Sequence, residues 1–160
     1  MNLFKVIFKE LVMTELKLQL YGSLKAIFLH IDNHEKAFLA QFGLNIPRYF
    51  VLFHLNNKPG ITNMDLSDLL LCTKSNTSRI VQGMIKDGYL TRLGHPDDRR
   101  SFQLYLSESG KALFDEVQPA FNQKIVELMS LIDSDKIDPY LRVSQSIEHI
   151  LASARQTPLL

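Results

Sequence analysis

The stretch that decides the fold is ITNMDLSDLLLCTKSNTSRIVQGMIKDGYLTRLGHPDDRRSFQLYLSESG, residues 61–110. Its pattern predicts a short capped helix, a sharp turn, a second capped helix, and two alternating strands on either side of a basic loop. A helix-turn-helix followed by a basic hairpin is typical of proteins that bind duplex DNA, because such elements fit neighbouring grooves. The stretch therefore suggests a DNA-binding protein.

Two threonines mark the starts of the helices in this stretch. Thr62 is followed three residues later by Asp65, the spacing at which the two residues can cap each other's backbone amides. Thr73 follows the turn and is predicted to cap the second helix, which is expected to end at Gly88. The core-facing side chains of the first helix are expected to be Leu66, Leu69 and Leu70.

The segment before this stretch is predicted to be helical. Residues 3–43 carry apolar side chains at helical spacing, and Gly43 suits the end of such a helix. Gly22 and the pair Asp32–Asn33 are weak points at which the helix is expected to break or bend. Another helix is predicted to begin near Ile46–Pro47, because proline suits the first helical turn.

The C-terminal third of the chain is also predicted to be helical. Ser107 is expected to cap one long helix, and the run Asp133-Ser134-Asp135 separates it from a last helix. Both terminal regions carry more apolar surface than a small winged helix can cover, so a second copy of the chain is the simplest partner. The alternative is that these helices fold back on one another within a monomer.

The predicted fold class is mainly α (α+β), a winged helix-turn-helix with long N- and C-terminal dimerisation helices. Residues 1–43 are expected to form an N-terminal helical dimerisation region and residues 44–107 the DNA-binding winged helix-turn-helix. Residues 108–160 are expected to form a C-terminal helical dimerisation region. A chain of 160 residues fits one structural domain overall.

Charge is distributed unevenly along the chain, although the formal net charge is only +1. Between Lys74 and Arg100 there are six Lys or Arg and three Asp, and from Ser107 onward there are five basic and eight acidic residues. This asymmetry concentrates positive potential on the region predicted to meet phosphates and leaves the acidic region free to self-associate.

The cysteine content and the N-terminus bear on the compartment. A single cysteine, Cys72, cannot form an intramolecular disulfide, which favours a reducing compartment. Lys5, Lys9 and Glu10 interrupt the apolar N-terminal residues, so neither a signal peptide nor a membrane span is expected. We expect a cytoplasmic protein with no membrane partner.

The helix that follows Thr73 is predicted to read DNA. Its apolar residues fall on one face, and the opposite face carries side chains that can pair with base edges or phosphates. We expect Arg79 to be the main base or phosphate contact; the alternative is a solvated polar face without a ligand. The full set of predicted DNA-binding residues on this helix is Thr73, Ser75, Asn76, Thr77, Arg79, Gln82 and Lys86, although Thr77 also falls on the apolar face.

The loop GHPDDRRS carries the second predicted contact to DNA. Arg99 and Arg100 are adjacent at the tip of the hairpin, so their side chains point to opposite sides. A narrow minor groove attracts an inserted arginine. Asp98 is placed to brace the wing by holding an arginine or the loop backbone. The alternative is a solvated turn with an ion pair of little energetic value.

At this point the sequence resembles the MarR family of winged helix-turn-helix transcriptional regulators. The resemblance is carried by LSDLL, by SNTSRIVQGMIKDGYLTR and by DDRRSFQLYLSESG. The last segment resembles the family signature of an aspartate, any residue and an arginine, then Leu-Thr and Gly; these positions are Asp98, Arg100, Leu106, Ser107 and Gly110. IPRYFVLFHL also resembles the family's second helix.

The resemblance implies a homodimer with recognition helices in successive major grooves and wing arginines in the flanking minor grooves. Three positions depart from the family pattern. Ser107 replaces the usual threonine, Tyr49 replaces a common glutamine, and Gly83 lies inside the recognition helix. A glycine there costs about 1 kcal/mol relative to alanine, and indicates either close helix packing or flexibility.

The resulting functional hypothesis is a repressor that binds a pseudo-palindromic operator in double-stranded DNA as a homodimer and is released by a small-molecule effector. The alternative is a winged-helix protein-interaction module, which should carry apolar residues on the outer face of the recognition helix. An enzyme is not expected, because the sequence has no glycine-rich phosphate loop, nucleophile elbow or convincing acid pair.

Several weaker candidates remain. His30 and His34 are one helical turn apart, which suits a metal, although exposed histidine pairs are commoner than sites. Cys72 near a helix start is either a thiol sensor or, as we prefer, a small packing residue. No cofactor is expected. Six aromatic side chains are candidates to line a pocket for an aromatic or phenolic effector, and the alternative is that they only pack in the core. They are Phe28, Phe38, Phe42, Tyr49, Phe50 and Phe53.

Overall fold

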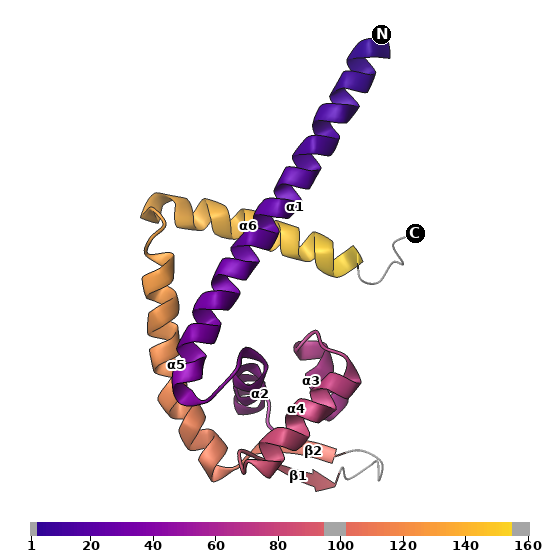
Figure 1. Cartoon of the computed structure of the whole chain (residues 1–160). Coiled ribbons are helices and arrows are strands. Elements are labelled where there is room, and N and C mark those ends of the chain that lie inside the picture. Colours follow the sequence, from indigo (N-terminus) through magenta and orange to yellow (C-terminus); the bar gives the residue numbers. More distant parts are fainter. Residues whose placement is uncertain (1–2, 95–101, 155–160) are drawn as a thin grey trace. The chain divides into compact units, whose positions relative to one another are not determined.

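The computed structural model describes the backbone of residues 3–94 and 102–154 and the side chains of residues 8–94 and 102–154. Within these residues the chain is mostly helical, with one two-stranded sheet, which confirms the predicted fold class (Figure 1). The elements are α1 (Leu3–Leu39), the 3-10 helix η1 (Ala40–Phe42), α2 (Ile46–Asn57), α3 (Asn63–Leu69), α4 (Lys74–Lys86), β1 (Leu90–Gly94), β2 (Phe102–Leu106), α5 (Glu108–Met129) and α6 (Ser134–Ala154).

The chain divides into two compact units, Met1–Val117 and Gln118–Leu160, which are described separately. The first unit contains α1 to β2 and the first half of α5, and the second contains the rest of α5 and α6. The two units are defined by the contacts that each makes within itself. The division into dimerisation and DNA-binding regions stays a prediction.

Helix α1 is continuous, so the break considered at Gly22 or Asp32–Asn33 does not occur. One glycine weakens a helix by only about 1 kcal/mol, and a helix of 37 residues has hydrogen bonds on both sides of it. Asp32 also pairs with Lys36 one turn later, which favours the helix. The predicted stop at Gly43 is confirmed, since this residue adopts a φ of 66° and closes the turn.

Helix α2 is the buried centre of the first unit. The Asn45 side chain caps it by accepting a hydrogen bond from the backbone N–H of Arg48, and proline occupies its first turn. The helix contacts α1, α3, α4 and β2. Its fully buried side chains are Tyr49, Val51, Leu52 and Leu55.

The phenol ring of Tyr49 lies in an aromatic cluster against α5. Its centroid is 6.4 Å from that of Phe114 and 5.3 Å from that of Phe50. Burial, followed by the nearby carboxyl of Glu35, raises the pKa of Tyr49 to about 12. Burial and the charge of Asp32 also raise the pKa of Glu35. The aromatic side chain at this position is therefore a core residue.

Helix α3 is only seven residues long, and one of its expected core residues was assigned wrongly. Leu66 is fully buried as expected and Leu70 is half-buried, but Leu69 is 37% exposed. Ser67 is buried in its place, with its hydroxyl bonded to the carbonyl of Met64. The buried stripe follows residues at positions i, i+1 and i+4, which leaves Leu69 at the edge.

Strands β1 and β2 form an antiparallel hairpin in which Leu90 opposes Leu106 and Gly94 opposes Phe102. The outer edge of β2 also bonds the segment between α2 and α3. The N–H of Gly60 donates to the carbonyl of Leu104 at 2.8 Å, and the N–H of Leu104 donates to the carbonyl of Ile61 at 3.0 Å. These backbone bonds attach the hairpin to the helix-turn-helix.

The end of the hairpin is joined closely to the end of α4. The hydroxyl of Ser107 donates to the carbonyl of Gly88 at 2.6 Å and accepts from the N–H of Gly110 at 3.0 Å, which confirms the predicted cap. The N–H of Ser107 donates to the carbonyl of Tyr89. A Cβ added to Gly110 would lie 2.0 Å from that carbonyl oxygen, so the first turn of α5 requires glycine here.

The buried face of α4 includes one polar side chain. Thr77, Val81 and Met84 point inward, and Thr77 is completely buried. Its hydroxyl has no hydrogen-bond partner among the residues that the structure describes. A buried hydroxyl without a partner is unfavourable, so Thr77 weakens the core that it helps to fill.

Apolar side chains remain exposed along the terminal helices. In α1, eight large apolar side chains between residues 8 and 21 are exposed, and α6 has no buried residue. On α6 the exposed apolar residues are Ile137, Tyr140, Leu141, Val143, Ile150 and Leu151. Among the described residues, no helix combines the length and apolar character needed to cross a membrane.

Replacing Gly110 by Ala is expected to destabilise the protein by roughly 3 kcal/mol, because the added Cβ overlaps a backbone oxygen that cannot move alone. Thermal unfolding followed by circular dichroism measures the effect. Gly22→Ala is the matched control, since a Cβ there meets nothing within 4 Å and should stabilise α1 by about 1 kcal/mol. Equal melting temperatures for the two variants would contradict the close approach.

Replacing Thr77 by Val is expected to stabilise the protein by about 1 kcal/mol, because a methyl group of the same shape replaces an unpartnered buried hydroxyl. Denaturant unfolding measures the change. Ser67→Ala is the contrasting control, because the hydroxyl of Ser67 is hydrogen-bonded and its removal should not stabilise. A clear loss of stability in Thr77→Val would show that the hydroxyl has a partner in solution.

Candidate nucleic-acid interface

The helix-turn-helix consists of α3, the turn after it and α4. Thr62 caps α3 as predicted: its Oγ1 accepts from the N–H of Asp65, and the Asp65 carboxylate accepts from the N–H of Thr62. In the turn, Leu71 has a φ of 52° and is 70% exposed. The N–H of Cys72 donates to the carbonyl of Ser67, which closes the turn.

Thr73 caps α4, which confirms the predicted start of the recognition helix. Its Oγ1 accepts from the N–H of Asn76 at 3.3 Å and lies 3.3 Å from the hydroxyl of Ser75. The positive end of the helix dipole and the first free amides lie at this exposed end, where a phosphate would be favoured. The helix ends at Lys86, with Asp87 as its C-cap, two residues before the predicted end at Gly88.

The outer face of α4 is polar. Ser75, Arg79, Gln82 and Lys86 are exposed and follow one another at helical spacing, and Asn76 beside them is partly exposed. One guanidinium nitrogen of Arg79 donates to the Oδ1 of Asn76 at 3.0 Å. A guanidinium has five donors, so this bond orients Arg79 and leaves donors for a base or phosphate.

The prediction of Thr77 as a DNA contact was wrong for this structure. Its side chain is 0% exposed and points into the core with Val81 and Met84. Because Thr77 lies on the apolar face of α4, the packing that exposes Arg79 necessarily turns Thr77 away. We exclude Thr77 from the candidate interface and retain the exposed residues.

One contact between the two helices was missed by sequence reasoning. The amide nitrogen of Asn63, in the first turn of α3, donates to the hydroxyl of Ser78 on α4 at 3.0 Å. Ser78 is half-buried and lies beside the residues predicted to face DNA. The bond therefore sets how α3 lies against the recognition helix. No local sequence signal predicted this pairing, because the residues are 15 positions apart.

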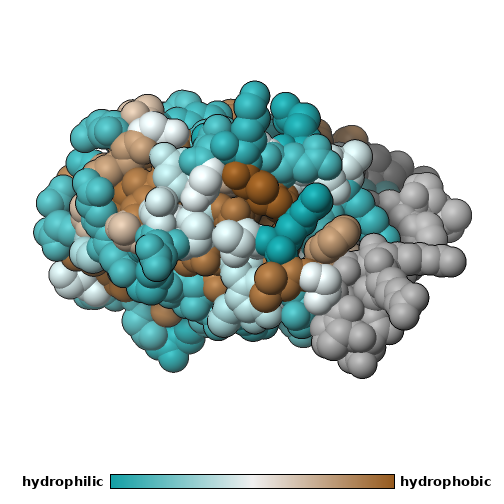
Figure 2. Space-filling model, turned by 90° about the horizontal axis from the view of Figure 1, so that it is seen from below, coloured by the Kyte–Doolittle hydropathy of each residue, from teal (hydrophilic) through white to brown (hydrophobic). Residues whose placement is uncertain are grey.

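The predicted wing contacts Arg99 and Arg100, and the bracing residue Asp98, lie outside the described residues. The strands on either side are described, and Gly94 pairs with Phe102, so the loop leaves and re-enters the hairpin at adjacent points. Figure 2 views the end of the molecule that carries the hairpin: hydrophilic side chains cover much of it, with apolar patches between them.

A third arginine of the hairpin, in addition to Arg99 and Arg100, was not predicted as a contact. The guanidinium of Arg92 on β1 lies 4.8 Å from the centroid of the Phe102 ring on β2. Arg92 opposes Leu104, so Phe102 is its diagonal neighbour across the strands. The register, which the sequence left open, was needed to recognise this pair. Arg92 is exposed and adds positive charge beside the wing.

The candidate metal ligands His30 and His34 lie on exposed positions of α1. Within residues 3–94 and 102–154, no group of three or more His, Cys, Asp or Glu side chains is suited to a metal. Cys72 is half-buried in the turn before α4, which agrees with a packing role. We assign none of the three to the interface.

The aromatic side chains considered for an effector site mainly contact one another. Phe38 lies 5.3 Å from Phe42, and Phe53 lies 6.4 Å from Phe114 of α5, measured between ring centroids. Phe28 is 55% exposed and belongs to the uncovered surface of α1. Core packing accounts for these contacts.

His54 lies beside Phe53 on α2. Burial, and secondarily the positive charge of Lys58, lowers the pKa of His54.

Comparison with known proteins agrees with this geometry. The sequence model described as MarR family matches residues 42–101, from the end of η1 into the wing. The chain is similar to the HTH-type transcriptional regulator BilQ of Clostridioides difficile (strain CD3), with 25% identity over 107 residues, 64% of this chain and 72% of BilQ. It is also similar to the transcriptional repressor MprA of Escherichia coli (strain K12), with 25% identity over 142 residues, 88% of this chain and 77% of MprA.

The fold is similar to that of a solved structure, the transcriptional repressor CouR bound to a 23-mer DNA duplex. The TM-score is 0.76 at 24% sequence identity, and the match covers 85% of this chain and 96% of CouR. The family match covers the helix-turn-helix and β1, and it ends immediately before β2. The central part of the chain therefore matches the MarR family of winged helix-turn-helix transcriptional regulators, and the chain is similar to regulators of that kind along much of its length.

Proposed function

We propose that this protein is a transcriptional repressor that binds a pseudo-palindromic operator in double-stranded DNA as a homodimer. The observation that carries the proposal is the exposed polar face of α4, a capped helix attached to α3 at one side and followed by the hairpin. The names of BilQ and MprA, and the DNA duplex bound to CouR, support the same function.

On DNA, α4 would lie in the major groove with Arg79 toward the base edges. Arginine pairs with guanine through two hydrogen bonds, and Asn or Gln pairs with adenine in the same way. Asn76 and Gln82 are therefore the adenine-reading candidates, while Thr73 and Ser75 lie where a phosphate would meet the helix N-terminus. Lys86 would contact the backbone at the other end.

The wing would enter the adjacent minor groove. Arg99 and Arg100 remain the proposed contacts, with Asp98 bracing them, and the exposed Arg92 would add a phosphate contact at the base of the hairpin. Positive charge on both elements would attract the same duplex, and the affinity should therefore fall steeply as salt increases.

The dimer would form through the terminal helices. Helices α1 and α6 leave many large apolar side chains exposed, and a partner normally covers a surface of that kind. A second copy would cover them and place two α4 helices about one helical turn of DNA apart, near 10 bp. We further propose release by a small aromatic or phenolic effector, and a cytoplasmic location in keeping with one free cysteine.

A winged-helix module that binds only protein is the second candidate. Such a module should present apolar side chains on the outer face of α4, because protein interfaces bury an apolar centre. The exposed positions of α4 are instead Lys74, Ser75, Arg79, Gln82 and Lys86. These residues favour DNA.

Replacing Arg79 by Ala is expected to lower the affinity for a selected operator duplex by about 1–3 kcal/mol and to change the base preference at one position, because one base contact is lost. Replacing Arg100 by Ala is expected to weaken binding strongly and to reduce its salt dependence. Fluorescence anisotropy at several salt concentrations measures both effects. Lys111→Ala on α5, which also removes one positive charge, is the control and should bind nearly as the wild type does.

Replacing Leu11 or Leu151 by Glu is expected to raise the dimer dissociation constant by about a hundredfold or more, because each dimer would lose two buried leucines. Sedimentation velocity measures the dimer fraction. Leu71→Glu is the matched control: Leu71 is 70% exposed but lies in the helix-turn-helix, away from the terminal helices. A wild type that sediments as a monomer at micromolar concentration would contradict the proposed dimer.

A further inference from the structure

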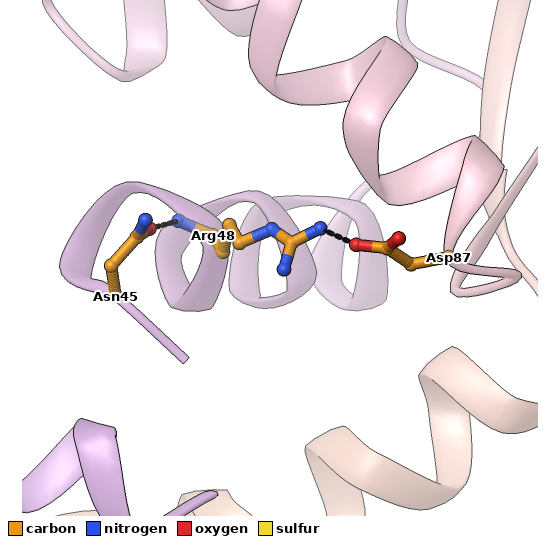
Figure 3. Close-up of polar contacts among 3 residues, drawn as sticks. All are labelled: Asn45, Arg48 and Asp87. Atoms are coloured by element: carbon orange, nitrogen blue, oxygen red, sulfur yellow. Dashed lines mark hydrogen bonds and ion pairs between the residues drawn. The ribbon is translucent and has the colours of Figure 1, made fainter. Parts of the chain in front are cut away.

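Helices α2 and α4 are joined by an ion pair between Arg48 and Asp87, residues 39 positions apart. Figure 3 shows the Arg48 side chain reaching from the first turn of α2 to the Asp87 carboxylate at the end of α4. The start of α2 is itself fixed, because the Asn45 side chain accepts from the N–H of Arg48 at 3.0 Å. Other ion pairs, such as Lys36–Asp32 and Lys111–Asp115, only join residues one helical turn apart.

The position of Asp87 is electrostatically unfavourable without a cation. Asp87 is the C-cap of α4, where the negative end of the helix dipole disfavours a carboxylate. The guanidinium of Arg48 offsets both the carboxylate charge of Asp87 and the negative end of the α4 dipole. It lies against the last turn of α4, since a Cβ added to Gly83 would be 3.9 Å from its Nη2. The Arg48 side chain is only 22% exposed, so it is held more firmly than a typical surface arginine.

Asp87 lies at the joint between the recognition helix and the hairpin. Its N–H bonds the carbonyl of Gly83, and Gly88 follows with a φ of 81°. The N–H of Tyr89 donates to the carbonyl of Met84 at 2.9 Å, and the carbonyl of Tyr89 accepts from Ser107 of the hairpin. A displacement of Asp87 would therefore move both the end of α4 and the start of β1.

Two polar contacts thus attach α4 to neighbouring helices. Asn63 of α3 holds Ser78 in the first half of α4, and Arg48 of α2 holds Asp87 at its end. Apolar packing holds α4 in the core, and two polar contacts at separate points along the helix restrict its angle more than one contact would. The angle decides where the exposed face with Arg79 points.

We propose that Arg48 and Asp87 are a positioning pair that sets the pose of α4 and of the hairpin for specific DNA binding. This inference rests on the proposed function, because it assigns the pair a role in reading DNA. The pair acts through Arg79 and the other exposed residues of α4, and neither Arg48 nor Asp87 contacts DNA.

The test uses substitutions of opposite charge. Arg48→Met removes a positive charge and Asp87→Asn removes a negative one, so a simple charge effect would weaken DNA binding in the first variant and strengthen it in the second. A positioning pair predicts that both variants lose affinity for the specific duplex, by about fivefold each, with little change on a scrambled duplex. The probes are a duplex selected from a random library and a scrambled duplex of equal length, titrated with the full-length protein.

The swapped double variant, Arg48→Asp with Asp87→Arg, keeps the net charge and should regain most of the specific affinity. It also keeps the test decisive if a single variant unfolds, which circular dichroism would detect. Lys111→Met and Asp115→Asn are the matched controls, because they make the same charge changes in a pair confined to α5. These controls should leave the preference for the specific duplex unchanged.

Three results would overturn the positioning pair: unchanged specific affinity in folded single variants, weaker binding in Arg48→Met with tighter binding in Asp87→Asn, or a swapped variant no better than the singles. A wild type that binds both duplexes equally would instead overturn the proposed function. The two failures are therefore distinguishable in the same titrations.

Discussion

Burial of the apolar face of α2 is the constraint on which the rest of the first unit depends. Tyr49, Val51, Leu52 and Leu55 are almost inaccessible to water, and the helix contacts α1, α3, α4 and β2. Each buried side chain of this size contributes about 1.5–3 kcal/mol, whereas a partly exposed ion pair contributes at most about 1 kcal/mol. Apolar packing around α2 therefore holds the elements together, and the polar contacts between them mainly decide angles.

The same packing separates structural from functional side chains on α4. Because side chains recur every 3.6 residues, turning Val81 and Met84 toward the core directs Arg79 and Gln82 toward solvent. Thr77 is one of the buried residues of α4 because of its position on the helix. Its hydroxyl group alone would also suit a residue that contacts bases. The reading face therefore follows from what the core requires.

Helix boundaries and turns were predictable to within about two residues, because the forces that set them are local. The caps at Thr62, Thr73 and Ser107 each involve a partner three residues later, and Gly43 ends a helix through its own backbone conformation. The errors had other causes. The break expected near Gly22 ignored the length of the helix on both sides, and Leu69 was placed inward although α3 is too short to have a wide buried face.

The sequence by itself determined the order of the elements, the family resemblance and the identity of the polar face on α4, because periodicity and capping act over a few residues. Only the tertiary structure decided how the elements are joined: Asn63 to Ser78, Arg48 to Asp87, and Gly110 against the carbonyl of Tyr89. These contacts connect residues 15 to 39 positions apart, and they are possible because burial of α2 brings the elements together. No local sequence pattern predicts a contact between residues so far apart in the chain.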